Sequence, residues 1–175
     1  NEFICAYAIV KYACAAANEK LGTLDKMLSK AIKDAAAEII DGKYPNDFPL
    51  SVWQTGSGTQ TNMNLNEVIS NRANELAGKQ RGEKKPVHPN DHVNKCQSTN
   101  DTYPSAIHIA AAIEVNKKLL PSLKLLEKEL AIKVNKFKNI VKIEPDHKCG
   151  LFGSVLYWSL CDISFSGPGC KVISK

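Results

Sequence analysis

Two polar segments near the middle of the chain carry the residues best suited to chemistry. The first runs over residues 54–64 (Gln-Thr-Gly-Ser-Gly-Thr-Gln-Thr-Asn-Met-Asn) and the second over residues 88–101 (His-Pro-Asn-Asp-His-Val-Asn-Lys-Cys-Gln-Ser-Thr-Asn-Asp). Both are rich in hydroxyl and amide groups, which cannot form an apolar core but can donate many hydrogen bonds to a small anion. The composition predicts a site for a small carboxylate rather than for a large apolar molecule.

Each segment leads into a predicted helix. Gly56 and Gly58 allow a ligand to approach the backbone closely, and Ser57 and Thr59 offer hydroxyl donors beside a helix N-terminus. Residues 98–100 (Ser-Thr-Asn) offer the same chemistry before the next helix. A turn that only caps its helix explains either cluster taken alone. Two clusters at helix starts favour one shared anion site.

Other polar residues have simpler interpretations. His88-Pro89-Asn90-Asp91 is a tight turn that a local hydrogen bond from the side chain of Asn90 or Asp91 explains. Cys96 is predicted to be a buried, inert thiol, and His108 a core histidine among Ile and Ala. The six cysteines form no CxxC pair and no zinc-type spacing with histidine, so we expect free thiols and no metal.

Hydrophobic periodicity predicts a mainly α protein. Helices are expected over 2–20, 24–41, 61–77 and 105–138, with Thr23 capping the second and Pro104 in the first turn of the last. Pro121 should kink or split that last helix. Its long apolar stripe needs covering helices, which we expect on missing segments or on another chain.

The overall composition limits the classes of binding partner that we expect. The net charge of +5 comes from lysines spread along helical stretches, which is typical of solvated helix faces and argues against a nucleic-acid surface. Residues 4–17 are apolar but are interrupted by Lys11. No apolar run approaches the roughly 20 residues of a membrane span, so we expect no membrane insertion.

Three motifs resemble the fumarase/aspartase superfamily. They are residues 53–60 (Trp-Gln-Thr-Gly-Ser-Gly-Thr-Gln), 62–67 (Asn-Met-Asn-Leu-Asn-Glu) and 95–101 (Lys-Cys-Gln-Ser-Thr-Asn-Asp). The first is similar to class II fumarate hydratases, whereas Cys96 and Thr99 lean slightly toward aspartases. The resemblance runs from about residue 3 to Ile143 in the family's order and spacing.

The resemblance implies reversible hydration of fumarate to (S)-malate in the tricarboxylic acid cycle, without metal or organic cofactor, in mitochondrial or cytoplasmic homotetramers. It implies the N-terminal helical domain of that fold (1–103) and the first long helix of its central helical bundle (104–143), followed by a divergent tail (144–175). It implies substrate binding by Ser57, Gly58, Thr59, Ser98, Thr99 and Asn100, and a second dicarboxylate site at His88, Pro89, Asn90 and Asp91.

The sequence departs from the family after Ile143. His147 stands at the position of a catalytic histidine, but its neighbours differ, and the later base serine and lysine motif is absent. Three hypotheses follow: a truncated hydro-lyase chain that is inactive alone, a non-catalytic module that binds dicarboxylate or assembles with full-length subunits, and an aspartase-type ammonia-lyase. The tail itself fits a shifted reading frame or a retained intron.

Overall fold

The computed structural model describes residues 2–50 and 58–139. Within these ranges the chain is helical and contains no strand, which confirms the mainly α prediction. The elements are α1 (Glu2–Lys20), α2 (Lys26–Ile40), α3 (Thr59–Leu76), η1 (Pro89–Val93), α4 (Thr99–Glu114), η2 (Val115–Leu119) and α5 (Leu120–Phe137), where η1 and η2 are short π-helical turns.

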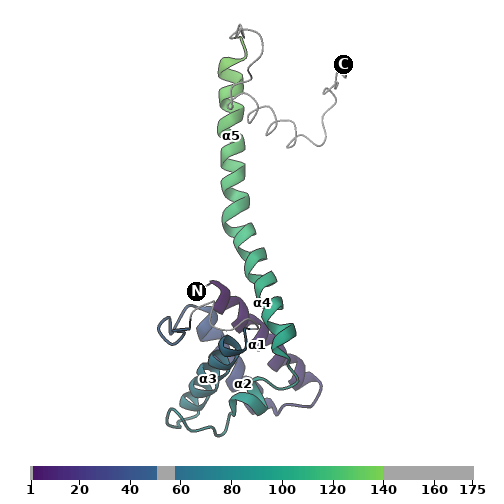
Figure 1. Cartoon of the computed structure of the whole chain (residues 1–175), viewed down its shortest axis with the longest axis vertical. Helices are drawn as coiled ribbons and strands as arrows, with labels where there is room; N and C mark the ends of the chain where they lie inside the picture. The colour runs from purple at the N-terminus through teal and green to yellow at the C-terminus, as the bar shows by residue number, and fades with distance from the viewer. Residues whose placement is uncertain (1, 51–57, 140–175) are drawn as a thin grey trace. The chain divides into compact units, whose positions relative to one another are not determined.

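Residue contacts divide the chain into two units, Asn1–Lys128 and Glu129–Lys175. In the first unit α1 packs against both α2 and α4, and α2 packs against α3 (Figure 1). The second unit is described as far as Asn139 and continues α5. The predicted division at residues 103 and 143 is not tested by these units and stays a prediction.

One apolar core holds the first unit together. Its largest members are Tyr7 of α1, Ile32 and Ile39 of α2, and Leu65 and Ile69 of α3, each at most 1% exposed. Alanine in α1 and α2 lets the helix axes approach closely, and Ala8, Ala35 and Ala36 are fully buried. This core holds the starts of α3 and α4 beside α1.

Two predicted helix starts were wrong in detail. Asp25, not Thr23, caps α2, because its carboxylate accepts from the backbone N–H of Met27 at 2.8 Å. Thr23 donates its hydroxyl to the carbonyl of Asn18 instead. The last long helix begins at Thr99 with Ser98 as its cap, so Pro104 lies inside α4 rather than at its start.

The predicted break at Pro121 is confirmed in a specific form. The π-helical turn η2 separates α4 from α5 just before the proline, and the Leu120 N–H bonds back to Val115 O. A wider turn at this point accommodates a residue that cannot donate a backbone hydrogen bond.

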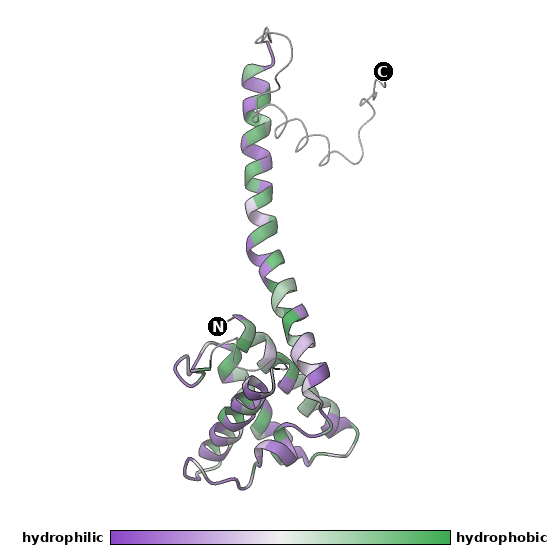
Figure 2. Ribbon diagram, in the orientation of Figure 1, coloured by the Kyte–Doolittle hydropathy of each residue, from purple (hydrophilic) through white to green (hydrophobic). Residues whose placement is uncertain are grey.

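Figure 2 shows hydrophobic and hydrophilic residues alternating along α5. Among the described residues, no helix is long and apolar enough to cross a membrane.

Candidate functional site

Gly58 places the first polar segment at the start of α3. It is buried and has φ +68°, in the left-handed region that favours glycine. A Cβ at this position would overlap the ring of Tyr103 on α4. Thr59 follows as the first residue of α3 and is exposed. Ser57, predicted to bind substrate, lies outside the described residues.

The second polar segment forms the start of α4. Ser98 is its N-cap, and its hydroxyl oxygen accepts from the backbone N–H of Asn100 at 3.3 Å. Thr99 is half-buried, whereas Asn100 is exposed. The three predicted ligand-binding residues of this segment therefore occupy the cap and first turn of a helix, where the helix dipole favours an anion.

The two helix starts meet in space. Asn62, in the first turn of α3, donates from Nδ2 to Thr99 Oγ1 and to Asn94 Oδ1, both at 3.1 Å. Gly58 packs on Tyr103, whose ring makes edge contacts with Phe3 and Tyr7 of α1. The structure thus links the start of α3 to the start of α4 through Asn62–Thr99 and Gly58–Tyr103.

A lysine missed by the sequence interpretation lies behind these segments. Lys11 of α1 is 0% exposed, and its Nζ donates to Asn62 Oδ1 (2.6 Å), Gln97 Oε1 (2.8 Å) and Asn94 Oδ1 (3.0 Å). Burial lowers the pKa of this ammonium to about 8, so it remains mostly charged at pH 7. The sequence does contain a signal for this buried cation, which is a lysine inside an alanine-rich apolar run. Lysine is rarely buried unless its charge has partners.

Tyr7 completes this buried network. Its hydroxyl donates to Asn62 Oδ1 at 2.8 Å and lies 3.0 Å from Thr102 Oγ1. Burial raises the pKa of Tyr7 to about 12, so the hydroxyl stays protonated and remains a donor. Asn62 Oδ1 therefore receives hydrogen bonds from two α1 side chains.

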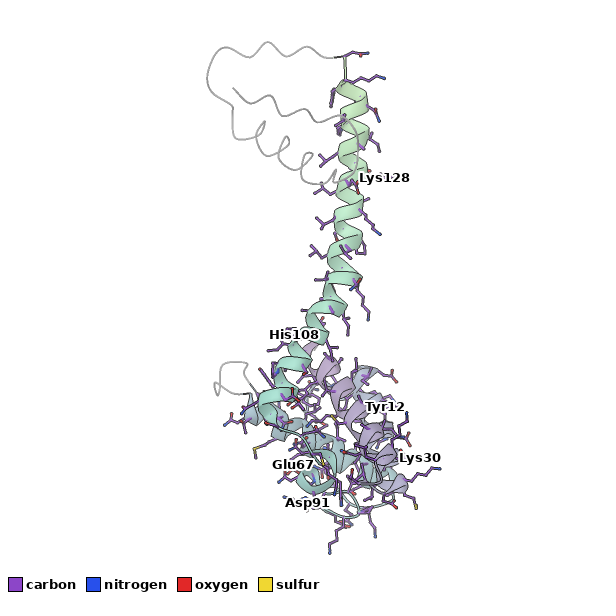
Figure 3. The ribbon with its side chains drawn as sticks, turned by 90° about the vertical axis from the view of Figure 1, so that its right-hand side faces the viewer. Tyr12, Lys30, Glu67, Asp91, His108 and Lys128 are labelled. Carbon is purple, nitrogen blue, oxygen red and sulfur yellow. The ribbon has the colours of Figure 1, made fainter. Side chains whose placement is uncertain are left out.

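The turn at residues 88–91 is tied together locally, but the histidine side chains make these backbone hydrogen bonds, rather than Asn90 or Asp91 as predicted. His88 Nδ1 accepts from the Asp91 backbone N–H at 3.2 Å, and the His88 N–H donates to His92 Nδ1 at 2.9 Å. Pro89 is buried and Asn90 is exposed. Asp91 is also exposed (Figure 3). Burial lowers the pKa of His92.

This turn also borders a basic surface pocket. The pocket has a volume of about 610 Å³, and its polar lining consists of Lys79, Lys84, Lys85, His88, Asp91 and His92. Lys79, Lys84 and Lys85 come from the exposed connection after α3. Three ammonium groups around one pocket favour an anionic ligand.

Two other predictions were wrong. Cys96 is exposed, not buried, and it lies at φ +57° in the turn between η1 and α4. His108 is also exposed (Figure 3), since α4 directs Ala106 rather than His108 into the core. His147 lies outside the described residues. Within the described ranges, no group of three or more His, Cys, Asp or Glu side chains could hold a metal ion.

Comparison with known proteins assigns the family. A protein-family model described as lyase matches residues 1–147. The chain belongs to this lyase family. The class II fumarate hydratase of Rhizobium meliloti is 61% identical over 142 residues, and mouse mitochondrial fumarate hydratase is 57% identical over 144 residues. The resemblance to class II fumarate hydratases is confirmed.

Solved structures agree with this lyase assignment. A class II fumarase from Schistosoma mansoni superposes with a TM-score of 0.84 at 42% identity, covering 93% of this chain and 35% of the other. The matches cover 81% of this chain and 31% of the Rhizobium protein, and 82% and 28% for the mouse protein. The chain thus spans about a third of the length of these lyases.

Proposed function

We propose that this chain supplies substrate-binding segments for the reversible hydration of fumarate to (S)-malate. The observation that carries the proposal is the meeting of two donor-rich helix starts, at Gly58-Thr59 and Ser98-Thr99, linked through Asn62. The names of the relatives support the same activity, which is that of a hydro-lyase. The substrate is a small dicarboxylate.

The chemistry of hydration fits such a site. Water adds its oxygen to one alkene carbon of fumarate, and a proton adds to the other; in reverse, a base removes that proton beside a carboxylate and the hydroxyl group leaves as water. Removing the proton builds negative charge on the adjacent carboxylate. Preorganised hydroxyl, amide and backbone donors stabilise this charge. Ser57, Gly58, Thr59, Ser98, Thr99 and Asn100 are the proposed substrate-binding residues.

A second dicarboxylate site is proposed at His88, Pro89, Asn90 and Asp91. The adjoining pocket supports it, because its lysines would attract a dianion while the π-helical turn holds the backbone in place. Asp91 would oppose an anion there, so the net preference rests on the three lysines. His147 is the proposed catalytic residue.

Turnover is tested by incubating the purified 175-residue chain with (S)-malate and following fumarate by its ultraviolet absorbance. Binding is tested in parallel by calorimetric titration with fumarate. We expect binding that Thr99→Ala weakens roughly tenfold, the loss of one hydrogen bond to a charged group. We expect little turnover from the chain alone. Absence of fumarate binding would contradict the proposal.

A second candidate is a non-catalytic module that assembles with full-length subunits. Val115, Leu119, Leu123 and Leu126 recur at helical spacing and are 39%, 51%, 48% and 55% exposed. Such a stripe favours contact with another helix. Homotetramers in mitochondria or the cytoplasm are the proposed setting for either candidate. An aspartase-type ammonia-lyase is separated from both by testing aspartate as substrate.

A further inference from the structure

We propose that Lys11 is a positioning residue of the dicarboxylate site, because its ammonium fixes the Asn62 amide and thereby directs the Thr99 hydroxyl toward the ligand. The same ammonium adds a positive charge behind the helix starts. The ligand part of this inference rests on the proposed function. Lys11 contacts the ligand only through Asn62 and Thr99, so its role is to position and not to react.

The orientation of Asn62 follows from hydrogen-bond chemistry. An ammonium only donates, so the amide atom 2.6 Å from Lys11 Nζ must be the oxygen. The amide nitrogen then faces Thr99 Oγ1 and Asn94 Oδ1, both at 3.1 Å. A flipped amide would place N–H groups against the ammonium. Lys11 therefore selects one orientation of the Asn62 amide.

That orientation determines what Thr99 can do. The Thr99 oxygen accepts from Asn62 Nδ2, so its own proton points away from Asn62. Thr99 is half-buried in the first turn of α4, where the next three backbone N–H groups already donate to Ser98. A hydroxyl whose acceptor role is filled is prepared to donate to a carboxylate.

The charge of Lys11 is not neutralised within the described part of the chain. Its three hydrogen-bond partners there are amide oxygens, the Tyr7 ring lies 5.3 Å from Nζ, and no described carboxylate forms an ion pair with it. Buried charges are normally paired. Because Thr99 is separated from the ammonium only by the Asn62 side chain, a bound dianion is the counter-charge that the site lacks.

A purely structural lysine would behave differently. It would hold α1 against the two polar segments. Its loss would then lower the stability of the fold without specifically weakening the binding of a dianion. The two roles separate when affinity for a dianion and thermal stability are measured on the same variants.

The first experiment titrates the full chain with succinate, a dicarboxylate that cannot be hydrated. Lys11→Met should weaken succinate binding at least tenfold, which corresponds to about 1.4 kcal/mol. Lys26→Met removes the same charge from an exposed position and should change affinity less than about twofold. Tyr7→Phe removes the other α1 donor to Asn62 while keeping the Lys11 charge, and should weaken binding less than about threefold.

A second variant keeps the test decisive if Lys11→Met fails to fold. Asn62→Asp has the same shape, and its carboxylate would pair with Lys11 and neutralise it. A carboxylate cannot donate, so Thr99 would have to turn its proton toward residue 62. We expect the variant to remain folded, because its carboxylate pairs with Lys11, and to bind succinate at least tenfold more weakly.

Each result bears on the inference. Succinate binding within threefold of wild type in folded Lys11→Met or Asn62→Asp overturns it. If the wild type binds no succinate, the proposed function fails, and NMR of the Asn62 side-chain amide decides the positioning role alone. Exchange-protected Nδ2 protons that lose protection in Lys11→Met, but not in Lys26→Met, support that role. Unchanged protection overturns it.

Discussion

At the scale of single residues, two positions carry more constraint than their types suggest. Gly58 must adopt a left-handed backbone and also leave room for the Tyr103 ring. Lys11 must remain an ammonium without contact with water. Both constraints place donors at the two helix starts, so the candidate site depends on backbone conformation and burial as well as on its hydroxyl groups.

Gly58→Ala should lower the free energy of unfolding by about 2 kcal/mol, through left-handed strain plus displacement of Tyr103. Gly78→Ala is the matched control, because Gly78 has φ +76° but open space around its missing Cβ. The control should lose only about 1 kcal/mol. Urea unfolding followed by circular dichroism measures both. Equal losses would show that contact with Tyr103 is unimportant.

The free energy of unfolding of the wild type should rise with pH relative to that of the Lys11→Met variant. Its pKa falls from 10.5 when unfolded to about 8 when folded, so the unfolded state binds more protons between these values. The difference in unfolding free energy should shift in favour of wild type by roughly 3 kcal/mol from pH 8 to 10.5. Burial raises the pKa of both Tyr7 and Cys14, which acts in the opposite direction in each protein. A flat difference across this range contradicts the buried ammonium.

At the scale of elements, an ion-pair cluster joins α2 to α3. Glu38 accepts from Arg72 Nη2 at 3.1 Å and from the Tyr44 hydroxyl at 3.0 Å. The Arg72 guanidinium holds the pKa of Glu38 at about 2, below its usual 4.5. These helices carry much of the core, so the cluster fixes the register in which α3 presents its first turn.

Arg72→Gln should therefore destabilise the protein at neutral pH by about 2 kcal/mol. Because the folded pKa of Glu38 is depressed, its contribution is present above about pH 4.5 and is lost as pH falls toward 2. The gap between wild type and variant should close over that window. Lys84→Gln breaks only the exposed pair with Glu67, at 3.8 Å, and should change stability less than about 0.5 kcal/mol. Guanidinium unfolding from pH 2 to 7 tests both, and a constant gap would refute the assignment.

At the scale of the whole molecule, an exposed apolar stripe runs along the last helical turns of the first unit. It consists of Val115, Leu119, Leu123 and Leu126. Apolar side chains exposed at regular helical spacing gain free energy when another helix covers them. The assembly proposal therefore concerns this stripe and not the polar site.

The chain should self-associate at micromolar concentration, and the double variant Leu119→Gln/Leu126→Gln should shift it toward monomer. Leu125→Gln is the matched control, because Leu125 is 61% exposed but lies off the stripe. Size-exclusion chromatography with light scattering measures the mass. A wild-type monomer at high concentration, or equal effects of both changes, would contradict assembly through the stripe.

Local pattern was enough to predict much of the fold. Periodicity predicted α1 to within its described ends, and the predicted ends at 41 and 77 lie one residue beyond those of α2 and α3. Helix starts were less predictable, because Asp25 and Thr23, or Ser98 and Pro104, are chemically suitable for nearby roles. Only the competition among backbone donors decides between them.

The sequence by itself determined the helical class, the two donor-rich segments and the lyase family, because these depend on residue types and spacing along the chain. Only the tertiary structure decided that Asn62 and Thr99 meet, that Gly58 faces Tyr103 and that Lys11 lies behind them. These contacts join residues far apart in the chain. They arise because the start of α3 meets α4 and α4 packs on α1, which no local pattern specifies.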